Sequence, residues 1–258
     1  MSAIIRLVSM QGYVFRLFFE SLKEILSDVN LVFTKDSMSV LTVDNVRVAL
    51  VHAYIDASKL DKYYCARDSF IAGINLEHVF KMLKMITHND TIEINIYEET
   101  PSFIDFVIHN SEKNCTTSFK VRMLDLVHPD IKLNDKEHDS VFILPSTAFQ
   151  KICRDMMIIS DVVKIEYEND HVSFSSTSDV ASRKDTFRPH EQGLVFTKQS
   201  RNKFSQLFNI KYLNLFSKAT NLCSVSIIHL RDREPMTIKY AVSNIGFISY
   251  TLAPIFAE

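Results

Sequence analysis

The chain consists of two halves that resemble each other, and this internal duplication constrains the fold more than any other feature. Residues 15–26 read FRLFFESLKEIL and residues 149–159 read FQKICRDMMII, both with apolar residues at helical spacing. The tripeptide SDV follows each segment, at 27–29 and at 160–162. Self-similarity at a nearly constant offset indicates a repeated structural unit, so the two halves are expected to share one plan.

The match continues in the segments that follow. Residues 29–41 and 162–175 alternate between apolar and polar side chains around an Asp-containing turn, which predicts two hairpin strands in each half. Residues 76–86 and 208–219 have helical spacing again, and a strand pattern follows both. Four matches in the same order predict an α+β chain of two similar domains, each with antiparallel sheets and two helices.

A segment without periodicity, residues 122–138, separates the halves. Its sequence RMLDLVHPDIKLNDKEH mixes charges with isolated apolar residues and is not rich in Gly or Ser, so we expect an extended connector that follows a fixed surface path. The predicted division is an N-terminal domain at 1–121, the connector at 122–138 and a C-terminal domain at 139–258. Ser146 is the expected N-cap of the third helix.

The composition is ordinary for a globular chain, with 47% hydrophobic and 23% charged residues among 258. Only 4 residues are Gly, and no Gly-rich phosphate-binding motif occurs. Because the net charge is −2, any contact with nucleic acid must come from segregated charge. No apolar run approaches 18 residues and no signal-peptide pattern is present, so we expect neither a membrane span nor a leader.

Candidates for a metal site are few. Asp56, Asp61 and Asp68 are the carboxylates that could form a metal site, but Asp56 and Asp61 flank a polar stretch typical of a loop. The sequence therefore predicts no bound metal and no cofactor. Loss of activity on chelation would favour an enzyme instead.

Candidates for thiol chemistry are equally weak. Cys65 has His52 and His78 as conceivable partners, yet no motif of a thiol nucleophile surrounds it. The four cysteines, at 65, 115, 153 and 223, form no CxxC pair, which favours reduced, buried thiols in an intracellular protein. We therefore expect no catalytic residue and no enzyme.

Each predicted helix carries two basic residues on one side, away from its apolar stripe. The stripes are Phe15, Phe18, Leu22 and Ile25; Leu76, Val79, Phe80 and Leu83; Phe149, Ile152, Cys153 and Met156; and Phe208, Tyr212, Leu215 and Phe216. The cations are Arg16 and Lys23, Lys81 and Lys84, Lys151 and Arg154, and Lys211 and Lys218. A single such face is usually only solvated, but four in duplicated domains favour a surface that attracts phosphates without reading bases.

Short segments along the whole chain resemble the PCNA family of sliding DNA clamps. The matching segments are VD at 43–44 with VRVAL at 46–50, YCARD at 64–68, MLDL at 123–126, PS at 145–146 with ICRD at 152–155, YLN at 212–214 with KAT at 218–220, and YTLAP at 250–254. The low Gly count and the abundance of Ile, Phe and Asn indicate a divergent member from a virus or a protist.

This resemblance implies two DNA-clamp domains per chain and a homotrimeric ring, with sheets outside and the eight helix cations facing double-stranded DNA in the hole. It also implies a clamp loader and a DNA polymerase as partners, together with other replication and repair proteins. The location would be the nucleus, or the viral replication compartment. Partner peptides would dock beneath the connector. By match, that pocket consists of Val43, Arg47, Val48, Leu50, Ile131, Leu133, Pro235, Leu252, Ala253, Pro254 and Ile255.

Four positions depart from the family pattern. Arg47 stands where the family usually has His, and Asn134 and His138 replace a Pro and a Tyr of the connector, so the peptide preference is expected to differ. Asn169 occupies a loop position where many eukaryotic members have a modifiable Lys.

The resemblance also implies which strands meet between subunits. These are residues 112–120 and 179–187, with Phe119, Val180 and Phe187 as apolar contacts. The second strand is markedly charged, which leaves a second assembly open: a monomeric or dimeric viral-type processivity factor of the same fold. The mass of the protein in solution separates the two.

Overall fold

The computed structural model describes residues 2–128, 131, 139–168, 170–199 and 203–256. The chain forms two compact units. The first comprises Met1–Thr42, His52–Ile131 and Ala241–Ile248, and the second comprises Val43–Val51, Lys132–Tyr240 and Ser249–Glu258. Each unit therefore includes a short segment from the other half of the sequence, and the simpler division at 1–121, 122–138 and 139–258 stays a prediction.

The first unit contains antiparallel strands and two helices. Five strands pair in the order β5-β1-β7-β8-β9, and four more are adjacent in the order β4-β3-β2-β6. Their bounds are β1 Ala3–Ser9, β2 Asp28–Thr34, β3 Ser37–Val43, β4 Ala49–Asp56, β5 Lys62–Cys65, β6 Ser69–Asn75, β7 Asp90–Tyr97, β8 Phe103–Asn110 and β9 Cys115–Arg122. The helices are α1 Gly12–Lys23 and α2 Leu76–Leu83, with a single 3₁₀ turn, η1, at Ala57–Lys59.

The second unit repeats this plan. One sheet has the order β13-β12-β11-β15, and five further strands are adjacent in the order β14-β10-β16-β17-β18. The bounds are β10 Ser140–Pro145, β11 Val162–Glu168, β12 His171–Thr177, β13 Ser182–Phe187, β14 Val195–Lys198, β15 Phe204–Asn209, β16 Val225–Leu230, β17 Met236–Val242 and β18 Gly246–Leu252. The helices are α3 Ser146–Met157 and α4 Ile210–Phe216, which continues into the 3₁₀ turn η2 at Ser217–Asn221. The predicted α+β class with two similar domains is confirmed.

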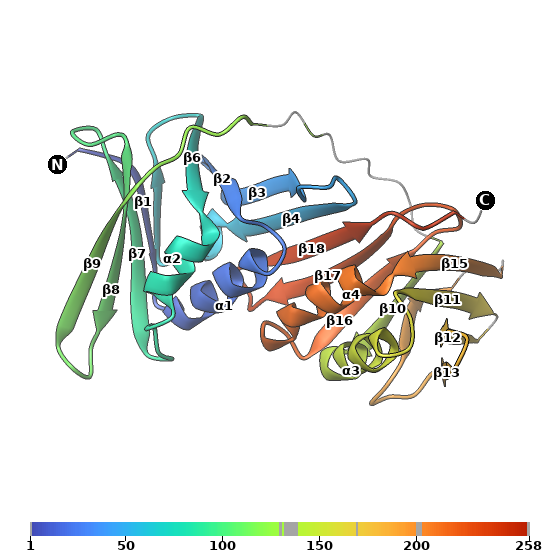
Figure 1. Ribbon diagram of the computed structural model, residues 1–258. Helices are drawn as coiled ribbons and strands as arrows, with labels where there is room; N and C mark the ends of the chain where they lie inside the picture. Colours follow the sequence, from blue (N-terminus) through green and yellow to red (C-terminus); the bar gives the residue numbers. More distant parts are fainter. Residues whose placement is uncertain (1, 129–130, 132–138, 169, 200–202, 257–258) are drawn as a thin grey trace. The chain divides into compact units, whose positions relative to one another are not determined.

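The helices form because their apolar stripes match the cores beneath them. In the first unit α1 and α2 lie side by side (Figure 1). Phe15, Phe18 and Leu22 are fully buried, and the ring of Phe19 meets the ring of Phe106 on β8 edge-on, with centroids 6.2 Å apart. Burial of side chains of this size is what stabilises such short helices, each residue contributing about 1.5–3 kcal/mol.

An asparagine begins the second helix of each unit. The Asn75 side chain accepts a hydrogen bond from the His78 backbone N–H at 2.9 Å, and the Asn209 side chain accepts one from the Lys211 N–H at 3.0 Å. Each asparagine is also the last residue of a strand, so it ends β6 or β15 and starts α2 or α4. This repeated cap is a sign of the duplication that the sequence comparison missed.

Several predicted helix limits are corrected by the structure. Ile25 lies beyond the end of α1, and Phe208 is buried on strand β15 instead of α4, because the Asn209 cap starts the helix two residues later. Ser146 is the first helical residue of α3, so the N-cap position falls on Pro145, whose side chain cannot accept a hydrogen bond. The buried hydroxyl of Ser146 has no hydrogen-bond partner among the described residues, and its backbone N–H donates to the carbonyl of Ser224 at 2.8 Å. The buried positions on α4 that periodicity missed are Ile210 and Leu213.

Candidate nucleic-acid interface and peptide pocket

The eight helix cations fall into two groups by exposure. Arg16 and Lys23 of α1 are half-buried. The other six are exposed: Lys81, Lys84, Lys151, Arg154, Lys211 and Lys218. The structure thus keeps three pairs of cations open to solvent, one pair on α2 and its C-cap residue Lys84, one on α3, and one on α4 and η2.

The two cations of α1 have contacts within their own unit. Arg16 donates from Nη1 to the carbonyl of Ile86 at 3.0 Å and lies over the ring of Tyr13. Lys23 lies 4.8 Å from the ring centroid of Phe80 on α2 and pairs with Glu24. Lys23 thus contacts α2, and Arg16 contacts Ile86 beyond the end of α2. Because both side chains are engaged within the unit, their contribution to phosphate binding is expected to be smaller than that of the exposed cations.

The exposed cations have weak ion pairs or none. Lys81 pairs with Glu77 at 2.8 Å, and Lys211 pairs with Asp161 at 3.2 Å. For Lys84, Lys151 and Lys218, no ion pair occurs within the described part of the chain. Because an exposed pair contributes only about 0–1 kcal/mol, phosphates can compete for all of these cations.

A tight turn carries four of the predicted pocket residues. Asp44 follows β3 and accepts hydrogen bonds from the backbone N–H groups of Val48 and Ala49, both at 2.7 Å, on Oδ1. Its Oδ2 accepts a third hydrogen bond from the Tyr212 hydroxyl at 2.6 Å. These three donors hold the turn between Val43 and Leu50, where Arg47 adopts a left-handed backbone with φ 58°.

The charges at this turn follow from its geometry. Burial alone would raise the pKa of Asp44, but the hydrogen bonds from Tyr212, Ala49 and Val48 outweigh it and lower the pKa below its usual value. Burial, then the hydrogen bond to Asp44, and then the negative charge of Asp44 raise the pKa of Tyr212 to about 12. The pair is therefore a carboxylate bound to a neutral phenol across the whole physiological range.

The C-terminal segment lies beside this turn. The Ala253 N–H donates to the carbonyl of Val48 at 3.5 Å, and the Ile255 N–H donates to the carbonyl of Leu207 on β15 at 2.7 Å. The structure thus brings together Val48, Ala253, Pro254 and Ile255 in one surface, with Pro235 also exposed. Leu252, by contrast, is fully buried beneath them.

Two apolar side chains that the sequence analysis did not select belong to the same segments. Val46 is 67% exposed at the tip of the Asp44 turn, and Phe256 is 68% exposed after Ile255. Exposed apolar side chains beside a predicted recognition surface are a signal of binding that periodicity could not supply. Ile131 is half-buried and belongs to the first unit, while Leu133, Asn134, His138 and Asn169 lie outside the described residues.

The start of the connector is held against the first unit. Leu124 forms a bridge with Gly73 of β6, and the Asn30 side chain donates to the carbonyl of Val127 at 3.3 Å. A Cβ atom on Gly73 would lie 2.2 Å from the carbonyl oxygen of Leu124. Only glycine permits this approach, so Gly73 sets the path on which the connector leaves β9.

The predicted subunit edges are edge strands. β9 and β13 are each the last strand of their sheet, and among the described residues each pairs with one neighbour only. Phe119 on β9 lies opposite Phe106, and Phe187 on β13 packs edge-on against Phe174 with centroids 5.9 Å apart. Val180 precedes β13 and is 93% exposed. Such open edges are templates for pairing with another chain.

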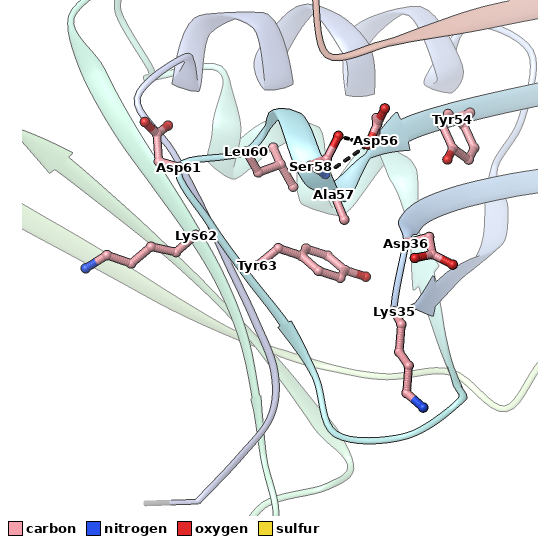
Figure 2. Close-up of a pocket in the computed structure, with 10 residues that line it drawn as sticks. All are labelled: Lys35, Asp36, Tyr54, Asp56, Ala57, Ser58, Leu60, Asp61, Lys62 and Tyr63. Carbon is pink, nitrogen blue, oxygen red and sulfur yellow. Dashed lines mark hydrogen bonds between the residues drawn. The ribbon is translucent and has the colours of Figure 1, made fainter.

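The carboxylates considered for a metal site have other roles. Two of them, Asp56 and Asp61, line a cavity of about 610 Å³ that Figure 2 shows, whereas Asp68 lies outside its lining. The lining residues are Lys35, Asp36, Tyr54, Asp56, Ala57, Ser58, Leu60, Asp61, Lys62 and Tyr63. Asp56 accepts hydrogen bonds from Ser58, Asp61 accepts one from the Met10 N–H at 2.7 Å, and Asp68 pairs with Lys35. Within the described ranges, no group of three or more His, Cys, Asp or Glu residues could hold a metal ion.

Cys65 and the two histidines considered with it have different neighbours. The buried thiol of Cys65 contacts the carbonyls of Phe33 and Arg67, while the ring of His52 meets the ring of Phe247 at 5.1 Å. His78 is exposed on α2. No helix within the described ranges is long and apolar enough to cross a membrane.

Comparison with known proteins identifies the family. The model of the proliferating cell nuclear antigen N-terminal domain matches residues 5–131, and that of its C-terminal domain matches residues 132–255. The chain therefore belongs to the proliferating cell nuclear antigen (PCNA) family, and the predicted resemblance is confirmed.

Named relatives agree with this assignment. The chain is 32% identical to the "Probable DNA polymerase sliding clamp 1" of Paramecium bursaria Chlorella virus 1, over 96% of this chain and 95% of the relative. It is 25% identical to the PCNA of Dictyostelium discoideum, over 95% and 96% of the two chains. The crystal structure of PCNA from Entamoeba histolytica shares the fold, with a TM-score of 0.90 at 20% identity, and the match covers 98% of this chain and all of that one. A divergent member with viral and protist relatives is consistent with these matches.

Proposed function

We propose that this chain is the subunit of a sliding DNA clamp, a processivity factor that encircles duplex DNA and tethers a DNA polymerase to it. The observation that carries this proposal is the match of both PCNA domain models in succession, over residues 5–255. The clamp is not an enzyme and needs no cofactor, because its task is to hold other proteins on DNA. It acts where DNA is replicated, in a nucleus or in a viral replication compartment.

The exposed cations of α2, α3, α4 and η2 face the DNA in this proposal. Lys84, Lys151 and Lys218 offer charge to phosphates without first giving up an intramolecular ion pair in the described part of the chain. With a net charge of −2 per chain, contact is weak and non-specific, as sliding requires. The same reasoning assigns a smaller share to Arg16 and Lys23, whose side chains are engaged with Ile86 and with Phe80 of α2.

Ring closure uses the two edge strands. We assign β9 of one subunit to pair with β13 of the next, since both edges are open and carry Phe119 and Phe187 at their inner faces. A head-to-tail contact of this kind closes into a ring, and three subunits give the homotrimer. A monomeric or dimeric clamp of the same fold is the competing assembly, and a clamp loader is needed only by the closed ring.

Partner proteins bind on the surface formed by the Asp44 turn and the C-terminal segment. The proposed ligand is a short peptide with the pattern Q-x-x-hydrophobic-x-x-aromatic-aromatic, whose anchors suit the apolar side chains Val48, Pro254 and Ile255. Calorimetry should detect binding of this peptide at high micromolar concentration, and a titration without binding would contradict the assignment. Replication and repair proteins that carry such peptides are the partners that we propose for this surface.

Retention on circular DNA tests the clamp function directly. The loaded protein should stay on a nicked circle at a salt concentration that abolishes its binding to short duplexes. Cutting the circle once should then release it within minutes, because topology and not contact energy retains it. A protein that stays bound after the cut, or that protects one particular sequence, would contradict the sliding mechanism.

A further inference from the structure

A second cavity continues from the proposed peptide surface toward β15. It has a volume of about 520 Å³ and shares Pro254 and Ile255 with the peptide surface. Its other lining residues come from β11, from β15 and the residue before it, from the β16–β17 turn and from the C-terminal segment. They are Lys164, Lys203, Phe204, Ser205, Gln206, Leu207, Asp232, Arg233 and Phe256. A peptide anchored at Ile255 would therefore extend one of its ends into this cavity.

The charge of the lining is unbalanced. Three cations, Lys164, Lys203 and Arg233, face one carboxylate, Asp232. Neighbouring carboxylates hold the two lysines: Glu166 pairs with Lys164 at 2.6 Å, and Glu168 pairs with Lys203. For Arg233, no ion pair occurs anywhere in the described ranges, so this guanidinium is the cation most available to a ligand.

Arg233 has an unusual backbone conformation. Arg233 is exposed at the turn between β16 and β17 and has a left-handed backbone, with φ 57°. A non-glycine residue in this region costs on the order of 1 kcal/mol, and the cost is tolerated where the surrounding structure fixes the residue. Gly or Asn would adopt this conformation at a lower free energy, so the presence of Arg here favours a binding role for its guanidinium.

The cavity wall also has an unused acceptor. Gln206 is only 7% exposed, and its Nε2 donates to the carbonyl of Glu234 at 3.1 Å. Its carbonyl oxygen has no hydrogen-bond partner among the residues the structure describes. A buried oxygen without a partner costs about 1–3 kcal/mol, and a backbone N–H of an extended peptide would supply the missing donor.

We propose that this cavity is a subsite for acidic residues that flank the anchor motif of a partner peptide. The proposal rests on the proposed function, because the anchor must first bind at the Asp44 turn and the C-terminal segment. Arg233 forms the main contact with a flanking Glu or Asp, Lys203 reinforces it, and exposed Phe256 covers the apolar part of the flank. A neutral or basic flank gains nothing from these cations, so the subsite selects among partners.

Calorimetry with matched peptides tests the subsite. All peptides carry one Q-x-x-hydrophobic-x-x-aromatic-aromatic anchor, extended at either its N-terminal or its C-terminal side by three Glu, three Gln or three Lys. At low salt we expect the Glu extension at one side to bind about five- to tenfold more tightly than the Gln extension. The advantage should shrink several-fold at 0.5 M salt, because rim charges are screened.

Variants separate the subsite from a general charge effect. Arg233→Gln and Lys203→Gln should each reduce the Glu advantage, while Arg188→Gln, which removes an exposed charge outside the cavity lining, should leave it unchanged. Equal binding of the Glu and Gln peptides to the unaltered protein would overturn the subsite while leaving the anchor pocket intact. A Gln peptide that does not bind at all would overturn the pocket and the subsite together.

Discussion

The hydrogen bond between Tyr212 and Asp44 is predicted to hold the turn that carries the peptide surface. Tyr212→Phe removes only the hydroxyl that donates to Oδ2 of Asp44 at 2.6 Å. A hydrogen bond to a charged group contributes about 1.5–3 kcal/mol, and the carboxylate is nearly buried, so we expect the free energy of unfolding to fall by about 2 kcal/mol. Asp44→Ala loses all three hydrogen bonds but also avoids burying a charge, so we expect a loss of about 3 kcal/mol.

Urea unfolding at pH 7 measures the change in stability, and calorimetry with the anchor peptide measures the change in affinity. Both variants should bind the peptide about tenfold more weakly, because part of the binding free energy must then order the turn that includes Arg47 and Val48. Tyr64→Phe is the control, since Tyr64 is exposed and its hydroxyl has no hydrogen bond within the described chain. A loss below about 0.5 kcal/mol in Tyr212→Phe would refute the reasoning.

The pH dependence of this difference has a definite sign. The folded pKa of Asp44 lies below its usual value, so the unfolded chain binds more protons than the native protein as the pH falls. The stabilisation from Asp44 is therefore fully present above the unfolded pKa of about 4 and disappears as the pH falls through the lower folded value. The stability difference between the unaltered protein and Asp44→Asn should shrink over that acidic range and stay constant between pH 6 and 8.

Three further changes test other parts of the molecule. A triple variant in which Ala replaces Lys84, Lys151 and Lys218 should show a weaker salt dependence of duplex binding in fluorescence anisotropy, with the oligomeric state unchanged. An unchanged slope of log affinity against log salt concentration would show that the DNA binds elsewhere. Gly73→Ala should destabilise the protein by about 1–3 kcal/mol in thermal unfolding and displace the connector, since the new methyl group meets a backbone carbonyl 2.2 Å away; a loss confined to a few tenths of a kcal/mol would show that the connector moves freely. Phe119→Asp should convert a trimer of about 90 kDa into monomers in light scattering, because an unpaired charge in a strand interface is costly; a trimer that persists would exclude β9 from the interface.

Much of the fold could be predicted from the local spacing of apolar and turn residues. The stripe of Phe149, Ile152, Cys153 and Met156 is buried on α3 as predicted, and the hairpin of β2 and β3 closes at Lys35 and Asp36. Such predictions work because a helix or a hairpin is determined by neighbours within a few residues. Helix limits were less predictable: Phe208 fits the spacing of α4, yet the Asn209 cap assigns it to a strand.

The candidate sites could be predicted only in part from the sequence. The cations on the helices could be counted, but the contacts of Arg16 with Ile86 and of Lys23 with Phe80 make α1 different from the other three helices. Periodicity places a residue on a face and cannot say which neighbouring element covers it. Phe256 and Val46 were missed for the same reason, since only their exposure marks them.

The sequence by itself determined the duplicated plan, the helical cations and the family, because repeats, spacing and motifs are written along the chain. Only the tertiary structure decided how distant segments act together. Asp44 and Tyr212 are separated by 168 residues, and the hydrogen bond between them is one of the three that hold the Asp44 turn. The cavity beside Ile255 likewise joins β15, the Arg233 turn and the C-terminal segment. Contacts of this kind depend on packing in three dimensions, where sequence separation carries no information about distance.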